Sequence, residues 1–156
     1  MPETLFEAFC PAYTAMGRGV PMEDMDHGEW ITTPERMRDN YARLDAEGGA
    51  HHLLLAYEGV EIVGVTEYLQ RPYAPRLIHQ ELTATNPRVQ GRGLGKQLKS
   101  VLLLHVLQLY PSLRWVVTEN AGSNAPMLSI NRRMGFRTHV AGHGYQLTRE
   151  ELGVAL

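Results

Sequence analysis

Between an extended stretch and a long helix with an apolar stripe, the chain reads Gln90-Gly91-Arg92-Gly93-Leu94-Gly95-Lys96. The three glycines occupy alternate positions, and helix-forming residues follow them at once. A loop of this kind can direct several backbone N–H groups the same way. The N-terminus of the following helix attracts an anion through its free N–H groups and its dipole. The stretch therefore predicts a phosphate-binding loop that leads into a helix.

Two other glycine-rich loops fit these residues poorly. A nucleoside-triphosphate P-loop needs Gly-x-x-x-x-Gly-Lys followed by Ser or Thr, but Gln90 holds the place of the first glycine and Gln97 follows Lys96. A dinucleotide fingerprint needs Gly-x-Gly-x-x-Gly after a buried strand, with an acidic residue about 20 positions later. Glu119 meets the last requirement. However, the glycine spacing differs, and Pro87 lacks the N–H that a central strand needs.

The segment from Thr83 to Lys96 resembles the signature of the GNAT superfamily of N-acetyltransferases, in which a strand ends at an Asn-Pro break before Gln-x-x-Gly-x-Gly. The three fixed positions are filled by Gln90, Gly93 and Gly95. A second block, from Asn124 to Phe136, resembles the family's Asn-x-x-Ala…Tyr-x-x-x-Gly-Phe. Two motifs in this order are much more specific than either one alone.

The order of predicted elements agrees with this resemblance. Apolar spacing and capping signals predict helices over residues 5–16, 32–44, 94–110 and 124–134, with Thr32 and Glu35 as the capping box of the second helix. Strands are predicted over residues 52–57, 60–68, 77–85 and 114–119, with a final pair between 136 and 147. One face of the long helix should carry Leu94, Leu98, Val101, Leu102 and His105.

We therefore expect one α+β domain over residues 1–156. The resemblance implies the GNAT-like acyl-CoA N-acyltransferase fold, a central mixed, mostly antiparallel sheet flanked by helices. That fold normally opens with a strand, and the sequence reaches its first helix too soon for one. In this respect it is most similar to the C-terminal halves of tandem GNAT proteins. A partner could supply the missing strand, so a homodimer is one expectation.

Composition narrows the partners and the compartment. The chain has 156 residues and a formal net charge of −2, and it contains no basic run, which argues against nucleic acid as the main partner. Its apolar runs are too short to cross a bilayer. The single cysteine, Cys10, cannot form an intramolecular disulfide and suits a reducing cytosol. We expect a cytoplasmic protein with no membrane partner and no metal site.

The resemblance implies acetyl-CoA as the acyl donor and a primary amine as the acceptor. An amine must lose a proton before it attacks the thioester, and a carboxylate, reached directly or through water, can serve as the base. GNAT enzymes take this base from either of two neighbouring strands, which makes Glu81 and Glu119 the expected catalytic residues and His79 a reserve. In a regular strand, the side chains of His79, Glu81 and Thr83 would share one face.

The same resemblance implies the donor site. The backbone of Thr83 and Thr85 should pair with the pantetheine arm like an added strand. The pyrophosphate should be held by Gln90, Gly91, Arg92, Gly93, Leu94, Gly95 and Lys96. Asn124 should fix the pantetheine or the opening between strands. Asn131 occupies the position of the family's usual acid, a tyrosine, and its amide can hydrogen-bond the donor but cannot give up a proton.

An acidic segment between the first two helices is the expected acceptor site, because loops on a rigid scaffold usually carry substrate contacts. The expected residues there are Glu23, Asp24, Asp26 and Trp30, with His79 from the sheet. Carboxylates beside a tryptophan suit a cationic, partly apolar amine, such as an amino sugar, a polyamine or an aminoglycoside-type antibiotic. Three alternatives stay open: a non-catalytic acyl-CoA-binding module, half of a tandem protein, or a protein amine as the acceptor.

Overall fold

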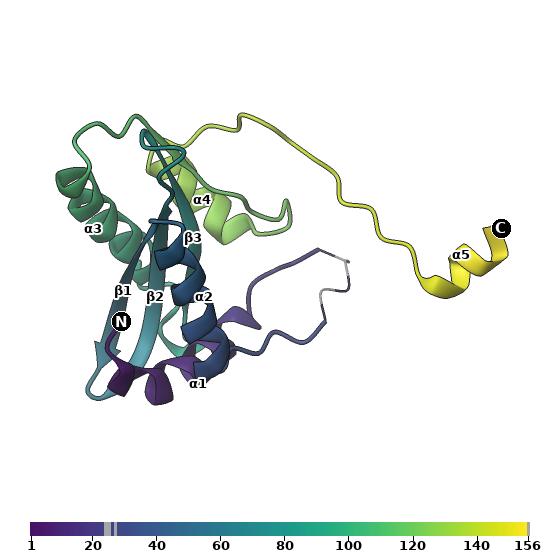
Figure 1. Ribbon diagram of the computed structural model, residues 1–156, viewed down its shortest axis with the longest axis horizontal. Coiled ribbons are helices and arrows are strands. Elements are labelled where there is room, and N and C mark those ends of the chain that lie inside the picture. Colours follow the sequence, from purple (N-terminus) through teal and green to yellow (C-terminus); the bar gives the residue numbers. More distant parts are fainter. Residues whose placement is uncertain (24–25, 27, 156) are drawn as a thin grey trace.

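The computed structural model describes residues 1–155 apart from residues 24, 25 and 27 (Figure 1). Its helices and strands are η1 (Glu3–Leu5), α1 (Phe6–Gly17), α2 (Pro34–Ala46), β1 (Ala50–Glu58), β2 (Glu61–Gln70), β3 (Leu77–Thr85), η2 (Pro87–Val89), α3 (Leu94–Leu109), β4 (Trp115–Val117), α4 (Ala125–Arg133) and α5 (Arg149–Ala155). Within the described residues, no helix is both long enough and apolar enough to cross a membrane.

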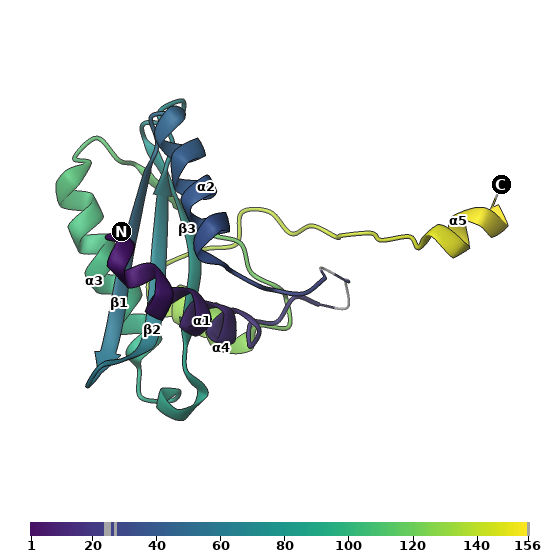
Figure 2. The ribbon, with the colours of Figure 1, turned by 60° about the horizontal axis from the view of Figure 1, so that its bottom comes forward.

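A four-stranded sheet in the order β1-β2-β3-β4 forms the centre of the molecule. The first three strands are antiparallel, and β4 joins β3 in parallel. On one face, Phe9 of α1 and Met37 of α2 pack against a core that includes Val65. On the other face, Val106 of α3 packs in a core with Tyr68. Figures 1 and 2 show this arrangement from two sides. The predicted α+β fold with a mixed, mostly antiparallel sheet is confirmed.

A bulge in β3 changes which side chains face the helices. Along β2 the register advances two residues, from Thr66 to Tyr68, while along β3 it advances three, from Thr83 to Gln80. The extra residue breaks the alternation of side chains. Thr83 therefore lies on the α3 face, where its Oγ1 accepts a hydrogen bond from Gln80 Nε2 at 2.9 Å. The prediction that Thr83 shares a face with Glu81 is wrong, because strict alternation ends at the bulge.

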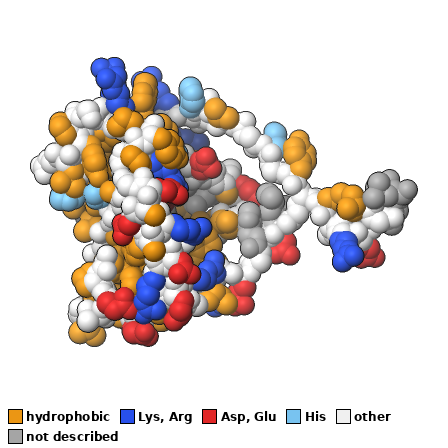
Figure 3. Space-filling model, in the orientation of Figure 1, with side chains coloured by type: hydrophobic (Ala, Val, Ile, Leu, Met, Phe, Trp, Pro, Cys, Tyr) orange, Lys and Arg blue, Asp and Glu red, His pale blue; other side chains and the backbone are white. Residues whose placement is uncertain are grey.

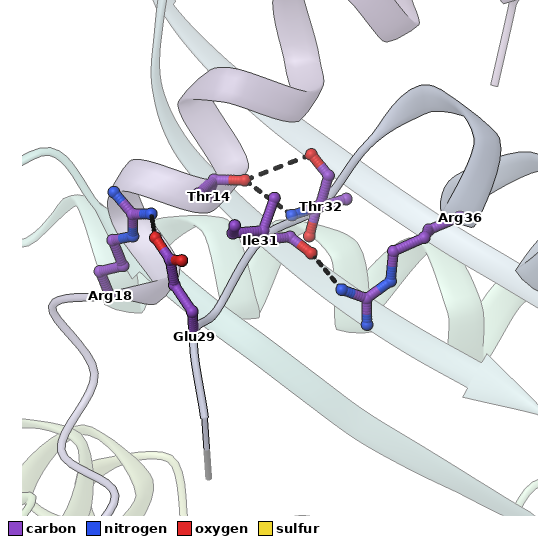
Figure 4. A network of polar contacts seen from close by, with 6 residues as sticks. All are labelled: Thr14, Arg18, Glu29, Ile31, Thr32 and Arg36. Atoms are coloured by element: carbon purple, nitrogen blue, oxygen red, sulfur yellow. Dashed lines mark hydrogen bonds and ion pairs between the residues drawn. The ribbon is translucent and has the colours of Figure 1, made fainter.

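Helix α2 begins one residue later than predicted. Thr33 is its N-cap and accepts a hydrogen bond from the Arg36 N–H at 3.3 Å, with Pro34 in the first turn. Thr32 is bound to α1 instead (Figure 4). Its N–H donates to Thr14 Oγ1 at 2.9 Å, and its carbonyl accepts from the same hydroxyl at 3.3 Å. Because Thr14 holds residue 32 in the connecting segment, the helix starts after it.

The buried face of α3 differs from the predicted one. Leu98 and Leu102 are buried as expected, but Val101 is 55% exposed and Lys99 is only 1% exposed. The helix packs on the sheet, and Lys99 also reaches α4, where its Nζ lies 2.6 Å from Asn131 Oδ1, so the buried surface includes this side chain. A lysine within an apolar stripe is normally taken to face solvent.

The pair of strands predicted between residues 136 and 147 is absent. Residues 136–148 form neither helix nor strand, and Tyr145 is 90% exposed. In Figures 1 and 2 this segment runs away from the sheet toward α5. Alternating side chains form a strand only where a neighbouring strand supplies hydrogen bonds, and none of the described strands pairs with this segment.

Candidate active site

The loop between β3 and α3 has the geometry of an anion site. Gly91 and Gly93 have φ angles of 76° and 81°, a left-handed conformation that glycine adopts at little cost. Gly93 is the N-cap of α3, and no side chain in the described part of the chain caps the helix. Among the hydrogen bonds of the described residues, none is donated by the backbone N–H groups of residues 91–96. These donors stand at the start of a 16-residue helix and fit a pyrophosphate.

Gly95 lets three elements meet behind this loop. A Cβ atom at residue 95 would lie 3.5 Å from Ile130 Cδ1 of α4 and 3.8 Å from Thr83 Cγ2 of β3. Arg92 in the loop carries a positive charge, and it forms an ion pair with Glu58: its Nη1 lies 3.8 Å from Glu58 Oε1. The glycine loop, the end of β3 and α4 therefore surround one region.

Beyond the bulge, one edge of β3 has no strand beside it among the strands that the structure describes. β4 pairs only with the first three residues of β3, whereas β2 pairs as far as Thr85. The Asn86 N–H donates to the Val63 carbonyl at 2.9 Å. Because hydrogen-bonded pairs alternate along an antiparallel ladder, the backbone groups of Thr83 and Thr85 are directed to the open edge. Gln90 Nε2 reaches the Thr85 carbonyl at 3.3 Å, which leaves Thr83 as the edge position without a partner strand.

Two buried asparagines belong to α4, on the far side of this edge. Asn124 is the N-cap of α4, and its Oδ1 accepts a hydrogen bond from the Met127 N–H at 3.2 Å. Asn131 donates from Nδ2 to Asn120 Oδ1 and accepts at Oδ1 from Lys99 Nζ, both at 2.6 Å. The two hydrogen bonds of Asn131 join α3, α4 and the segment after β4 in one polar network.

Lys99 is the charged member of this network. Burial lowers its pKa to about 8, and its Nζ lies 5.3 Å from the centre of the Phe136 ring. No carboxylate of the described residues forms an ion pair with it. One sequence signal indicates that Lys99 faces the site: it lies four residues after Gly95, on the same face of the helix.

The opposite face of the sheet carries a cavity of about 880 Å³, enclosed by α1, α2 and the segment before α2. Glu67 of β2 and Glu81 of β3 lie in its wall. Glu67 Oε2 lies 2.6 Å from His51 Nε2; the glutamate is buried and the histidine is partly buried. Glu67 Oε1 has no hydrogen-bond partner among the described residues. Burial and the neighbouring Glu67 carboxylate raise the pKa of Tyr13, another lining residue, far above its usual range.

The arginines around this cavity are already engaged. Arg18 Nη2 lies 2.6 Å from Glu29 Oε1, and Arg71 Nη1 lies 2.9 Å from Glu47 Oε2. Arg36 donates to a backbone carbonyl at 2.5 Å (Figure 4). Figure 3 shows red and blue side chains intermixed over the surface of α1 and α2. The rim therefore has no strong net sign, and Glu67 and Glu81 in the wall are without arginine partners among the described residues.

The structure separates the predicted acceptor residues. Asp26 and Trp30 line the cavity. Glu23 Oε1 accepts a hydrogen bond from the Ser123 N–H at 3.0 Å, which lowers the pKa of Glu23 and ties the segment to the connection before α4. Asp24 lies outside the described residues.

The three predicted candidates for the base also lie apart. Glu81 and Glu119 are both exposed, but only Glu81 lines the cavity, whereas Glu119 lies in the segment after β4. His79 pairs with Val117 where β4 begins to diverge from β3 and does not line the cavity. The sequence analysis missed Glu67. Its position two residues after the inward-facing Val65 in β2 was the available signal.

Gly17 fixes one wall of the cavity. A Cβ there would lie 2.4 Å from Trp30 Nε1, whereas one at Gly19 would meet nothing closer than a carbonyl at 3.5 Å. We expect Gly17→Ala to displace the indole and lower the free energy of unfolding by about 1–3 kcal/mol, as overpacking does. Gly19→Ala should change it by less than about 0.5 kcal/mol. Urea denaturation of both variants checks this, and equal effects would contradict the packing described.

Comparisons with known proteins agree with this geometry. Residues 4–136 match the family model described as acetyltransferase (GNAT) family. A tandem GNAT protein from the clavulanic acid biosynthesis pathway is 26% identical over 65% of this chain, with a TM-score of 0.62. The match covers only 32% of that protein. A search of curated proteins found no match.

Two further solved structures share the fold. An aminoglycoside acetyltransferase from an uncultured soil metagenomic sample, in complex with sisomicin, has a TM-score of 0.67 and 16% identity, covering 95% of this chain and 93% of its own. Glucosamine-6-phosphate N-acetyltransferase from Arabidopsis thaliana has a TM-score of 0.64 and 13% identity, covering 95% of both chains. With its glycine loop, its open strand edge and a family match over residues 4–136, this chain belongs to the GNAT family of acetyltransferases.

Proposed function

We propose that this protein transfers the acetyl group of acetyl-CoA to a primary amine of a cationic small molecule by direct attack in a ternary complex. The observation that carries the proposal is the course of β3. Its open edge begins at the glycine loop and leads to the bulge beside Glu81, in the wall of the cavity. A donor held along the edge and an amine in the cavity would therefore meet at the bulge.

The donor site in this proposal consists of backbone groups. The N–H groups of residues 91–96 would hold the pyrophosphate, with charge from Arg92 and Lys96, and the free groups of Thr83 would pair with the pantetheine arm. Asn124, capping α4, would border the arm. When bound, acetyl-CoA supplies the acetyl group as an activated thioester. The chain's own task is to orient that thioester against the amine.

The acceptor site in this proposal is the carboxylate-lined cavity. An ammonium group would be attracted by Glu67, whose Oε1 is unpartnered, and by Asp26 and Glu81. Glu81 would take the proton of the amine, directly or through water. Amino sugars, including aminoglycoside-type antibiotics, combine amines with a ring that Tyr13 and Trp30 can contact. The two fold neighbours named for such acceptors share only the fold with this chain. The choice is supported by Glu67 and Glu81, cavity carboxylates without arginine partners among the described residues.

The experiment measures free thiol released from acetyl-CoA in the presence of a panel of amines: aminoglycosides, hexosamines, polyamines, amino acids and peptide N-termini. We expect turnover with polycationic or amino-sugar acceptors and little with neutral ones. Turnover only with peptides would mean that the acceptor is a protein amine and not a small molecule.

One observation favours a second candidate, a non-catalytic acyl-CoA-binding module or half of a tandem protein. Asn131 cannot donate a proton to a leaving thiolate, and the solved tandem protein is matched over only 32% of its length. In this case coenzyme A would bind while no amine of the panel is acetylated. Calorimetry with coenzyme A, run beside the thiol assay, separates the two candidates.

The base can be assigned by comparing two isosteric variants. Glu81→Gln should lower kcat for the best acceptor by about 100-fold, the contribution expected of a general base, without changing the Kd of coenzyme A. Glu119→Gln removes an exposed carboxylate away from the cavity and should leave kcat within about twofold of the native value. The reverse result would move the base to the segment after β4.

A further inference from the structure

Lys99 is a buried cation without a counter-ion. Its side chain is 1% exposed, and its only close acceptor among the described residues is Asn131 Oδ1, at 2.6 Å, with Met127 Sδ at 3.8 Å. An unpaired charge in such a place is costly. A cation that persists under this cost is most useful where an anion forms.

The position of Lys99 relates it to the open edge of β3. Gly95 and Lys99 are four residues apart and share one face of α3. At Gly95 this face meets Thr83 of β3 and Ile130 of α4, and at Lys99 it meets Asn131, the next residue of α4. An arm that leaves the glycine loop and pairs with Thr83 would therefore run past Asn131, with Lys99 behind it.

Asn131 can relay the charge. Its Oδ1 accepts from the ammonium group, and one of the two N–H groups on Nδ2 donates to Asn120 Oδ1. The other N–H has no partner among the described residues. A cation bound to the amide oxygen polarises the whole amide group and makes that remaining N–H a stronger donor.

We propose that Lys99 acts through Asn131 as a positioning residue that stabilises the thiolate of coenzyme A when it leaves. The inference rests on the proposed function. As the amine nitrogen bonds to the acetyl carbon, the carbon–sulfur bond breaks and its electron pair stays on sulfur. The free N–H of Asn131 donates to this thiolate, which then takes a proton from water. The proton of the amine goes to Glu81.

The test compares coenzyme A with desulfo-coenzyme A, which lacks the thiol. We expect native protein at pH 8 to bind coenzyme A about threefold more tightly than the desulfo analogue by calorimetry, and the pKa of the bound thiol, followed by thiolate ultraviolet absorbance, to fall by about one unit. Lys99→Met should bring the ratio of the two affinities to about one and the pKa of the bound thiol to that of free coenzyme A. The affinity for the desulfo analogue should not change.

Two more variants separate a charge effect from a folding effect. Asn131→Asp keeps the shape of the side chain but neutralises Lys99 with a carboxylate, so it should abolish the preference for coenzyme A over the desulfo analogue. Lys96→Met should weaken both ligands equally and keep their ratio, because this cation faces the phosphates. A native protein that binds both ligands equally, or a ratio that survives Lys99→Met and Asn131→Asp, overturns the inference while acetyl transfer stands. If native protein binds neither ligand, the proposed function itself fails, and the inference with it.

Discussion

Replacing Gly93 with valine is expected to weaken coenzyme A binding by about 100-fold, the equivalent of about 2.7 kcal/mol. Residue 93 has a φ of 81°, which a β-branched side chain rarely adopts. The backbone would relax toward negative φ and turn the N–H groups of the loop away from a common point. Losing one or two charge-assisted hydrogen bonds, each contributing about 1.5–3 kcal/mol, gives the expected size. Calorimetry with coenzyme A measures it.

Gly59 provides a matched control. It also has a positive φ, of 63°, and a Cβ at either glycine would meet no atom within 4 Å. Gly59→Val, in the turn between β1 and β2, should therefore lose a similar free energy of unfolding while keeping the native Kd for coenzyme A. If both variants bind equally well, the glycine loop does not hold the pyrophosphate.

Replacing Lys99 with methionine is expected to stabilise the protein at neutral pH and to remove a pH dependence. The pKa of Lys99 is lowered by burial from 10.5 to about 8 in the folded chain. Below pH 8 the lysine is charged in both states, and the folded state bears the cost of burying it. Between about pH 8 and 10.5 the folded protein loses this proton first, so its free energy of unfolding should rise with pH by roughly 3 kcal/mol.

The measurement is the difference between native protein and Lys99→Met in urea denaturation from pH 7 to 10.5. Taking the difference cancels other groups, including Tyr68, whose hydroxyl donates to the Lys99 carbonyl at 3.5 Å and whose pKa is raised by burial. The variant should be more stable by roughly 3 kcal/mol at pH 7, and the two curves should meet near pH 10.5. Parallel curves would mean that the ammonium group is solvated.

Local sequence signals were sufficient for the glycine loop, β3 and α3. The glycines from 91 to 95, the break at Asn86-Pro87 and the stripe containing Leu98 and Leu102 each act within a few residues, and the structure places the loop, β3 and α3 where those signals predicted them. The family resemblance is confirmed by the match over residues 4–136.

The remaining features depend on contacts between segments far apart in the chain. The cap of α2 is at Thr33 because Thr14, 18 residues before Thr32, binds the Thr32 backbone. The bulge that separates Thr83 from Glu81 exists only in the pairing of two strands. Alternation between residues 136 and 147 does not form strands without a partner. Lys99 is buried because α4 covers it, which periodicity within α3 cannot reveal.

The short pairing of β3 with β4 has a consequence for local unfolding. Three residue pairs join these strands, so the part of the chain from β4 through α4 is held to the first three strands by fewer ladder hydrogen bonds than those strands share among themselves. Amide protons of α4 should therefore exchange with solvent faster than those of α3. A ligand that contacts both the open edge of β3 and α4 would bind only while the two parts are packed together. Its binding would therefore slow amide exchange in both parts.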